Sequence, residues 1–211
     1  LRGGGAERVL ATIASELSRR GHTVHVLTLQ SKPDFYPIDQ GIQRHRLNIA
    51  TPVRSPLAYL KAHRSRVRSI REVVESVAPD VTVSFMDRVN VFAIPAVTTG
   101  AVVVSERNNP MMSTSSLMIR LLRRLYYPKA SRVVCLSKGV CEALHWLPSD
   151  KKEVIYNPIM VEPSATAEEI PEFTFQQDRH YFIGVGRLTE QKGFDTLVHA
   201  FYSVAGSRED W

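Results

Sequence analysis

Apolar and polar positions follow a rhythm along this chain that is typical of α/β proteins. Short apolar runs rich in β-branched residues alternate with segments whose apolar residues recur every three or four positions. The first kind predicts buried strands and the second predicts amphipathic helices, so together they favour a parallel sheet with helices on both faces. The predicted strands are 23–29, 42–47, 81–85, 101–104, 133–136, 153–156 and 181–185. The predicted helices are 6–20, 56–77, 91–97, 117–127, 140–146 and a last one from 194 onward.

A polar loop lies between the last predicted strand and the last predicted helix. It begins at Gly186, ends at Gly193, and contains Arg187 and Lys192. The start of a helix offers free backbone N–H groups and a partial positive charge, so it suits an anion. Arg can hold a phosphate by two parallel hydrogen bonds, and Lys adds a mobile charge. From the residues alone, a clamp for the diphosphate of a nucleotide-linked ligand and an ordinary turn with solvated charges both remain open.

A second glycine-containing loop, 3–5, opens the first predicted helix, which has Glu7 in its first turn. Glycines let a backbone approach a ligand closely, although a flexible chain end explains them equally well. Glu7 complements the helix dipole there. A glycine loop of this kind normally follows a strand, and in doubly wound sheets that strand is central. We therefore expect the sequence to be a fragment whose first strand is missing.

Taken together, these two loops resemble a known family. The segments GVGRLTEQKGFDTLVHAF and GGGAERV are similar to the corresponding blocks of the retaining glycosyltransferases of family four, which have the GT-B fold. The resemblance implies a GT-B-like, Rossmann-type parallel-sheet domain followed by the truncated start of a second Rossmann-type domain. It also implies donor diphosphate binding by Arg187 and Lys192, with Gly186, Gly4 and Gly5 beside them. The glutamate pair that the family uses for the donor sugar would lie beyond the last residue.

The same resemblance divides the chain into three parts. Residues 1–158 are the expected acceptor-side domain, and 180–211 are the start of the nucleotide-sugar-binding domain. The segment between them, 159–179, is acidic, contains prolines and lacks periodicity, so it is expected to be a linker.

Polar side chains follow the fourth predicted strand, where a ligand of a parallel α/β sheet is expected. Ser105, Glu106, Arg107 and Asn108 are adjacent there. We interpret Ser105, Arg107 and Asn108, together with Glu7, as acceptor-side residues, with a plain polar loop as the alternative. Related enzymes often carry a His or an acid near this position. Glu106 is the only acid here, and it is therefore the candidate catalytic residue.

The net charge of +6 is unevenly distributed. Two predicted helices carry clusters of arginine, which indicate either solvated helix faces or a surface that meets an anionic membrane. No aromatic residues are interleaved with them, so nucleic acid is not an expected partner. The expected location is the cytoplasm, where the protein would attach peripherally to the inner face of the membrane. The arginines assigned to this surface are Arg64, Arg66, Arg68, Arg71, Arg120, Arg123 and Arg124.

Metal and disulfide chemistry are not expected. The seven histidines are scattered, without a metal-ligand spacing, and Cys135 and Cys141 do not form a CxxC motif. We therefore predict free thiols, no metal and no cofactor other than a nucleotide diphosphate sugar as co-substrate. No apolar run reaches the ~20 residues needed to cross a bilayer.

The function implied by the resemblance is transfer of a hexosyl residue from a nucleotide diphosphate sugar to a saccharide or lipid-linked glycan, with retention at the anomeric carbon. Such a transferase would serve cell-envelope polysaccharide or glycoconjugate synthesis, for example of lipopolysaccharide. This fragment alone is expected to be inactive. Two alternatives stay open: another GT-B-fold sugar-phosphate enzyme, such as an epimerase or phosphorylase, and a non-catalytic partner that binds glycan or membrane.

Overall fold

The computed structural model describes residues 4–31, 33–49, 56–110, 116–159 and 180–205. The chain separates into two compact units, Leu1–Ile159 and Met160–Trp211. Each unit is described by itself below.

Six parallel strands of the first unit form two sheets. Their order is β1-β2 in one sheet and β3-β4-β5-β6 in the other. These strands coincide with the first six predicted strands to within a few residues at each end. Their bounds are β1 (His25–Thr28), β2 (Gln43–Arg46), β3 (Val81–Phe85), β4 (Ala101–Glu106), β5 (Arg132–Cys135) and β6 (Lys152–Val154).

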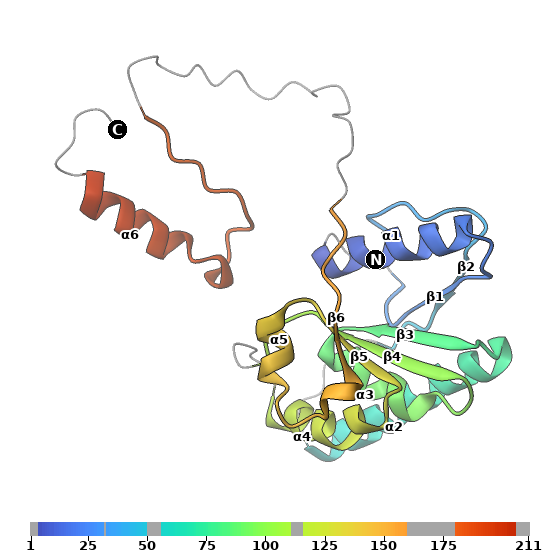
Figure 1. Cartoon of the computed structure of the whole chain (residues 1–211). Coiled ribbons are helices and arrows are strands. Elements are labelled where there is room, and N and C mark those ends of the chain that lie inside the picture. Colours follow the sequence, from blue (N-terminus) through green and yellow to red (C-terminus); the bar gives the residue numbers. More distant parts are fainter. Residues whose placement is uncertain (1–3, 32, 50–55, 111–115, 160–179, 206–211) are drawn as a thin grey trace. The chain divides into compact units, whose positions relative to one another are not determined.

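Helices cover these sheets and confirm the predicted α/β class. Helices α2, α3 and α4 lie together on one face of the four-stranded sheet, and α1 packs on the two-stranded sheet through Ala14 (Figure 1). Helix α3 begins four residues earlier than its apolar pattern predicted. The bounds of the first unit's helices are α1 (Gly5–Arg19), α2 (Pro56–Val77), α3 (Asp87–Ala96), α4 (Leu117–Tyr126), α5 (Lys138–Ala143) and the 3-10 turns η1 (Tyr127–Lys129) and η2 (Ser149–Lys151).

The main core lies between the four-stranded sheet and helices α2, α3 and α4. Val91, Val104 and Val133 are fully buried in it, and Leu27 of β1 and Leu47, which follows β2, pack against it. Apolar side chains from both sheets therefore share one core, although no hydrogen-bonded ladder joins β1 to β3 in the described residues.

The division between the two sheets falls beside β1 and β3. Val81 and Val83 of β3 are 52% and 47% exposed, which is unusual for β-branched residues of a parallel sheet. The absence of the first strand from this sequence stays a prediction.

The second unit contains one helix, α6 (Phe194–Ala205), among its described residues, with the 3-10 turn η3 (Glu190–Lys192) before it. The predicted helix from 194 is confirmed. The predicted strand 181–185 is wrong for the described residues, because no neighbouring strand pairs with it there. Gly184 and Gly186 pack directly on the Phe194 ring, where an added Cβ would lie 3.0 and 3.2 Å from ring carbons.

No helix in the described ranges is both long enough and apolar enough to cross a lipid bilayer.

One turn of the first unit depends on glycine. Gly100 precedes β4 with φ of +76°, and a Cβ added there would lie 2.5 Å from the Pro79 carbonyl oxygen. That oxygen belongs to backbone and cannot turn aside. Both the positive φ and the close backbone approach therefore require glycine.

We expect Gly100→Ala to lower the free energy of unfolding by about 2 kcal/mol or more. Gly139→Ala is the matched control, because a Cβ there meets nothing within 4 Å and the residue lies in α5. The control should be neutral or slightly stabilising. Urea unfolding of both variants measures this, and equal effects would contradict the account.

Candidate functional site

The candidate site lies at the carboxyl ends of β3, β4, β5 and β6. The register places Phe85 beside Ser105, Glu106 beside Cys135, and Cys135 beside Val154. Because all four strands are parallel, the loops that follow them meet at one edge of the sheet. Ligands of open α/β sheets bind at this edge.

Arg107 is the central side chain of this edge. It follows β4, and its guanidinium donates to Ser105 Oγ at 3.3 Å and to Asn157 Oδ1 after β6. It also lies over the Phe85 ring, 5.3 Å from the centroid. Arg107 is half-buried, and burial lowers the pKa of its guanidinium. These contacts tie the ends of three strands together and hold one planar cation at the edge.

Glu106 lies in the interior, one residue before Arg107. Its side chain is 1% exposed. Tyr127 Oη donates to Glu106 Oε2 at 2.8 Å, Arg123 forms an ion pair with the same oxygen at 3.0 Å, and the backbone N–H of Asn108 also donates to the carboxylate. Asn90 completes the network, since its Nδ2 donates to Tyr127 Oη at 3.0 Å and to the Ser105 carbonyl at 3.1 Å.

Burial controls the protonation of this network. It raises the pKa of Glu106 to about 7, although Arg123 and the hydrogen bond from Tyr127 act in the opposite direction. Burial and the neighbouring Glu106 also raise the pKa of Tyr127 well above its ordinary value. A catalytic role for Glu106 stays a prediction. Its contacts point inward, and they support a role in positioning Arg107 and Asn108.

The turn after β3 holds strained backbone at the same edge. Met86 has φ of +78°, an unusual conformation for a residue with a side chain. Its N–H donates to the Ser105 carbonyl at 3.2 Å. Asp87 follows as the first residue of α3, where its carboxylate accepts the Arg88 N–H at 2.8 Å and is 4% exposed. Such strain is common at functional sites, because only a rigid surrounding maintains it.

The predicted glycine loop contains the start of α1. Gly4 is the N-terminal cap and Gly5 the first residue of α1, while the preceding glycine lies outside the described residues. The Glu7 carboxylate folds back over Gly4, at the place that a Cβ would take. Gly4 is thus needed for Glu7 to lie over the helix start, as expected for an acid in a first turn.

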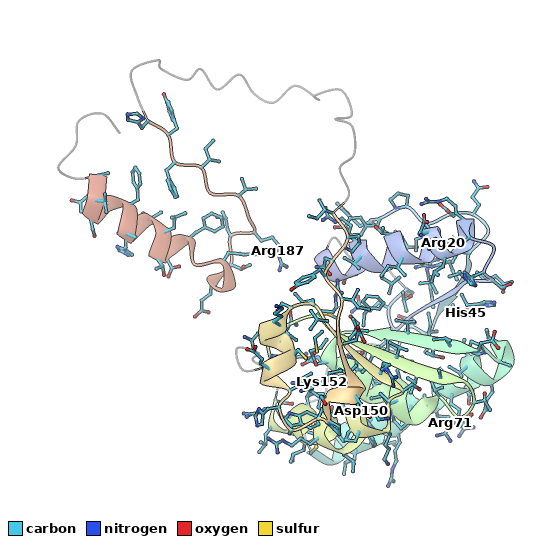
Figure 2. All side chains as sticks on the ribbon, viewed as in Figure 1. Arg20, His45, Arg71, Asp150, Lys152 and Arg187 are labelled. Atoms are coloured by element: carbon cyan, nitrogen blue, oxygen red, sulfur yellow. The ribbon has the colours of Figure 1, made fainter. Side chains whose placement is uncertain are left out.

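The predicted donor loop belongs to the second unit. Gly186, Arg187 and Lys192 are all exposed, and Arg187 projects from the loop before α6 (Figure 2). The loop is tightly folded, since Thr189 N–H donates to the Arg187 carbonyl at 2.8 Å and Lys192 N–H to the Thr189 carbonyl at 2.9 Å. Two cations therefore precede α6 on one short turn. Diphosphate binding by them stays a prediction.

The structure divides the seven arginines that were assigned to a basic surface. Arg64, Arg68, Arg120 and Arg124 are exposed. Arg66 and Arg71 are half-buried, with Arg66 over the Phe92 ring and Arg71 donating to the Pro95 carbonyl at 2.7 Å. The assignment of Arg123 to the surface is wrong: it is 4% exposed and paired with Glu106.

Metal ligands do not gather in the described ranges. No group of three or more His, Cys, Asp and Glu side chains is close enough there to hold an ion. Cys135 and Cys141 are free thiols, and burial raises the pKa of Cys135 to about 12. A requirement for a metal or cofactor is untested, so the expectation of none stays a prediction.

The comparison with known families now identifies this architecture. The family model "Glycosyltransferase Family 4" matches residues 3–162, which is most of the first unit and of the chain. The chain belongs to glycosyltransferase family 4. The resemblance carried by the two glycine loops is thereby confirmed at the level of the family.

Two curated relatives of this family-4 chain come from Campylobacter jejuni. One, an N-acetylgalactosamine-N,N'-diacetylbacillosaminyl-diphospho-undecaprenol 4-alpha-N-acetylgalactosaminyltransferase, is 30% identical over 94% of this chain and 56% of its own length. The other, a GalNAc-alpha-(1->4)-GalNAc-alpha-(1->3)-diNAcBac-PP-undecaprenol alpha-1,4-N-acetyl-D-galactosaminyltransferase, is 25% identical over 91% and 52%.

A third relative, an uncharacterized glycosyltransferase of Haemophilus influenzae, is 22% identical over 99% of this chain and 56% of its own length. The chain therefore spans about half the length of the curated relatives it matches.

Several site residues of the family-4 chain were missed from the sequence. Asn157 could have been found, because an Asn-Pro pair at a strand end marks a loop beside the other strand ends. Tyr127 could not, since it is separated in sequence from Glu106 and lies within an ordinary helical pattern. Asn90 stands in a short polar run after the third predicted strand, for which a helix cap with solvated neighbours is the simpler interpretation from sequence. Only the packing of α3 and η1 on β4 brings them together.

Glu106 predicts a specific dependence of stability on pH. Its pKa is higher in the folded chain than its ordinary value of 4.5, so the folded state binds more protons between pH 4.5 and 7. The free energy of unfolding should then fall across this range, by roughly 3 kcal/mol at most from this group. Glu106→Gln removes this fall. As the pH rises through this range, the free energy of unfolding of the wild type should therefore decrease relative to that of the variant.

Urea unfolding at a series of pH values measures that difference. Glu16→Gln on α1 is the control, because Glu16 is exposed and a hydrogen bond from Arg20 lowers the pKa of its carboxyl. For this control, the free energy of unfolding of the wild type should not decrease relative to that of the Glu16→Gln variant as the pH rises. If the free energies of unfolding of wild type and Glu106→Gln changed with pH in parallel, the pKa of Glu106 would not be raised by folding.

Proposed function

We propose that this chain forms the acceptor-side domain and the beginning of the donor-side domain of a glycosyltransferase. The enzyme transfers a hexosyl residue from a nucleotide diphosphate sugar to a lipid-linked saccharide, with retention at the anomeric carbon. The observation that supports this most directly is the polar edge around Arg107 in a chain that belongs to glycosyltransferase family 4.

The acceptor side rests on the rigidity of that edge. Arg107 is oriented by Ser105, Asn157 and the Phe85 ring, so its guanidinium needs little reordering when a polar ligand binds. Preorganised polar groups lose less entropy on binding than mobile ones. Arg107 and the half-buried Asn108 are therefore suited to hold the hydroxyl groups of a saccharide.

The donor side rests on the charges before α6. As the bond between the sugar and the diphosphate breaks, negative charge develops on the leaving diphosphate. Arg187 and Lys192 stabilise this charge, together with the N–H groups at the start of α6. The acceptor hydroxyl forms the new glycosidic bond, and its proton passes to the leaving diphosphate. This arrangement supplies positive charge without a metal, so we expect no metal requirement.

The lipid-linked acceptor is inferred from the relatives. The names of both Campylobacter relatives describe saccharides joined through a diphosphate to undecaprenol. An enzyme for such an acceptor works at the surface of a membrane. We infer that this chain acts on the same class of acceptor, in the synthesis of an envelope polysaccharide or glycoconjugate.

The test replaces the two donor cations in the protein at the length of its relatives. Arg187→Ala with Lys192→Ala should lower kcat/KM roughly 10²- to 10⁴-fold, because each lost charge-assisted bond contributes about 1.5–3 kcal/mol. Release of the nucleotide diphosphate from a panel of nucleotide sugars measures the activity. Activity with EDTA present should equal activity without it.

Arg19→Ala with Arg20→Ala is the control, since these two exposed arginines at the end of α1 are paired with Glu16 and lie away from the loop before α6 in sequence. The control should keep its activity. Full activity of the Arg187/Lys192 variant would refute the clamp, and no turnover of any donor by the wild type would refute the proposed function.

A further inference from the structure

Helix α4 exposes a continuous stripe of leucine. Leu117, Leu121 and Leu125 are four residues apart, so they lie on one face of the helix. They are 70%, 55% and 56% exposed. The opposite face is buried through Ile119 and Arg123. One such leucine would be ordinary on a protein surface, but three in one row form an apolar strip that water solvates poorly.

The surroundings of this leucine stripe are basic. Arg120 and Arg124 border it on the same helix and are both exposed, and α4 contains no acidic residue. Arg124 lies over the Trp146 ring, 5.6 Å from the centroid. An apolar row bordered by arginines is the pattern of a helix that lies in the plane of a membrane surface.

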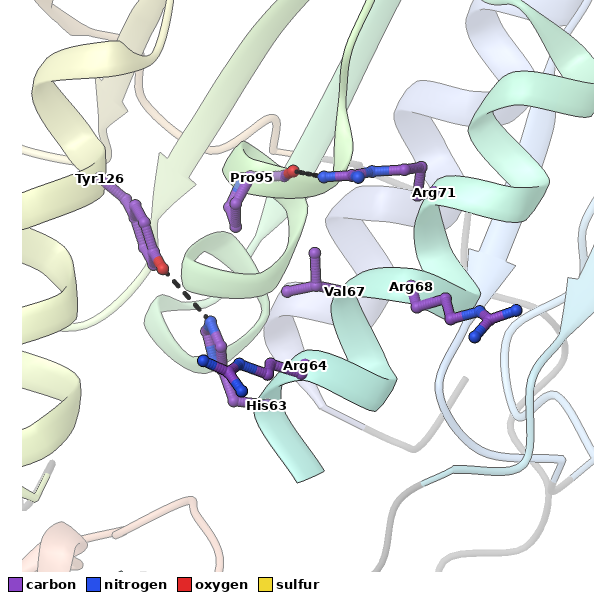
Figure 3. Close-up of a pocket in the computed structure, with 7 residues that line it drawn as sticks. All are labelled: His63, Arg64, Val67, Arg68, Arg71, Pro95 and Tyr126. Carbon is purple, nitrogen blue, oxygen red and sulfur yellow. Dashed lines mark hydrogen bonds between the residues drawn. The ribbon is translucent and has the colours of Figure 1, made fainter. Parts of the chain in front are cut away.

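A basic hollow lies beside α4. Its volume is about 360 Å³, and it lies between α2, the end of α3 and α4. Tyr126, the residue after Leu125, lines it from α4, while Arg64, Arg68 and Arg71 line it from α2 (Figure 3). Val67 gives the hollow an apolar part. Its charge suits an anionic group of the size of a lipid phosphate.

His63 gives the hollow a ring nitrogen without a hydrogen-bond partner in the described residues. Its side chain lines the hollow and is 7% exposed. Nε2 lies 3.4 Å from Tyr126 Oη, whereas Nδ1 has no hydrogen-bond partner within the described residues. Buried polar atoms are usually paired, so an unpaired one that lines a basic hollow favours a bound polar ligand.

We propose that α4 is a docking surface for an anionic lipid bilayer. The leucine stripe enters the boundary between headgroups and acyl chains, Arg120 and Arg124 lie among the headgroups, and the basic hollow receives a lipid phosphate. Burial of the leucines and attraction to anionic headgroups act together, so neither is required to suffice alone. This docking surface would hold the enzyme at a membrane that contains the proposed lipid-linked acceptor, so it builds on the proposed function. Its residues belong to α2 and α4, and the donor loop is not part of it.

The test measures binding of the protein at the length of its relatives to vesicles, without nucleotide sugar or acceptor. Vesicles of phosphatidylcholine alone are compared with vesicles that contain 30% phosphatidylglycerol. Binding should favour the anionic vesicles. Leu121→Ser with Leu125→Ser should weaken it about tenfold or more, and Arg120→Gln with Arg124→Gln should weaken it roughly 25-fold, about fivefold for each charge.

Two variants test the hollow and two serve as controls. Arg64→Gln with Arg68→Gln should weaken anionic binding to a similar degree. Val198→Ser with Val204→Ser removes two equally exposed apolar residues from α6, and Arg19→Gln with Arg20→Gln removes two exposed charges at the end of α1. Both controls should bind within about twofold of wild type. Near-UV circular dichroism establishes that each variant is folded, as expected for exposed positions.

Three results would overturn the proposal. These are equal binding to neutral and anionic vesicles, wild-type binding by the leucine variant, and a stripe that mediates self-association. The last would appear as a concentration-dependent dimer that the leucine variant loses, without vesicle binding. Failure of the proposed glycosyl transfer appears separately, because the leucine variant of the protein at the length of its relatives should keep wild-type activity toward a water-soluble acceptor.

Discussion

The buried carboxylate of Glu106 is the constraint on which the first unit depends. A carboxylate in the interior requires partners, because burial without them strongly disfavours its charge. Three elements supply these partners: Arg123 comes from α4, Tyr127 from η1, and the backbone N–H of Asn108 from the loop after β4. Asn90 joins α3 through Tyr127. One carboxylate therefore holds two helices, a turn and a strand end in a single arrangement.

The consequences of this arrangement reach two surfaces. On one side the chain leaves Glu106 directly into Arg107 and Asn108, so the polar edge of the sheet is fixed by the network beneath it. On the other side Arg123 anchors α4 by its inner face. The same anchoring leaves Leu117, Leu121 and Leu125 on the outer face. One buried ion pair thus orients both the proposed acceptor edge and the proposed membrane surface.

Most of the fold was accessible from sequence, and the reasons are local. The β-branched runs and the amphipathic periods place six strands and the helices between them, and the two glycine loops carry the family resemblance. Periodicity does not reveal partners, however. The run 181–185 has the composition of a strand but lacks a neighbouring strand in the described residues, and Arg123 belongs to a basic cluster by composition but to the core by packing.

The candidate site was predicted less completely for a related physical reason. Glu106 is one of several consecutive polar residues. Side chains alternate between the two faces of a strand, so the face that the Glu106 side chain occupies follows only if β4 includes this residue. The strand continues through Glu106, two residues beyond the predicted end, and this places the carboxylate against α4 and η1. Its ion pair with Arg123 supports a positioning role, and the catalytic role that the sequence suggested stays a prediction.

A double-mutant cycle between Glu106 and Arg123 tests this account most directly. The free energy of unfolding is measured at pH 8 for the wild type, Glu106→Gln, Arg123→Gln and the double variant. The account predicts a coupling of about 2 kcal/mol or more, because each single change leaves a buried group without its partner. Effects that add within about 0.5 kcal/mol would contradict it. The two residues would then be neighbours that do not depend on each other.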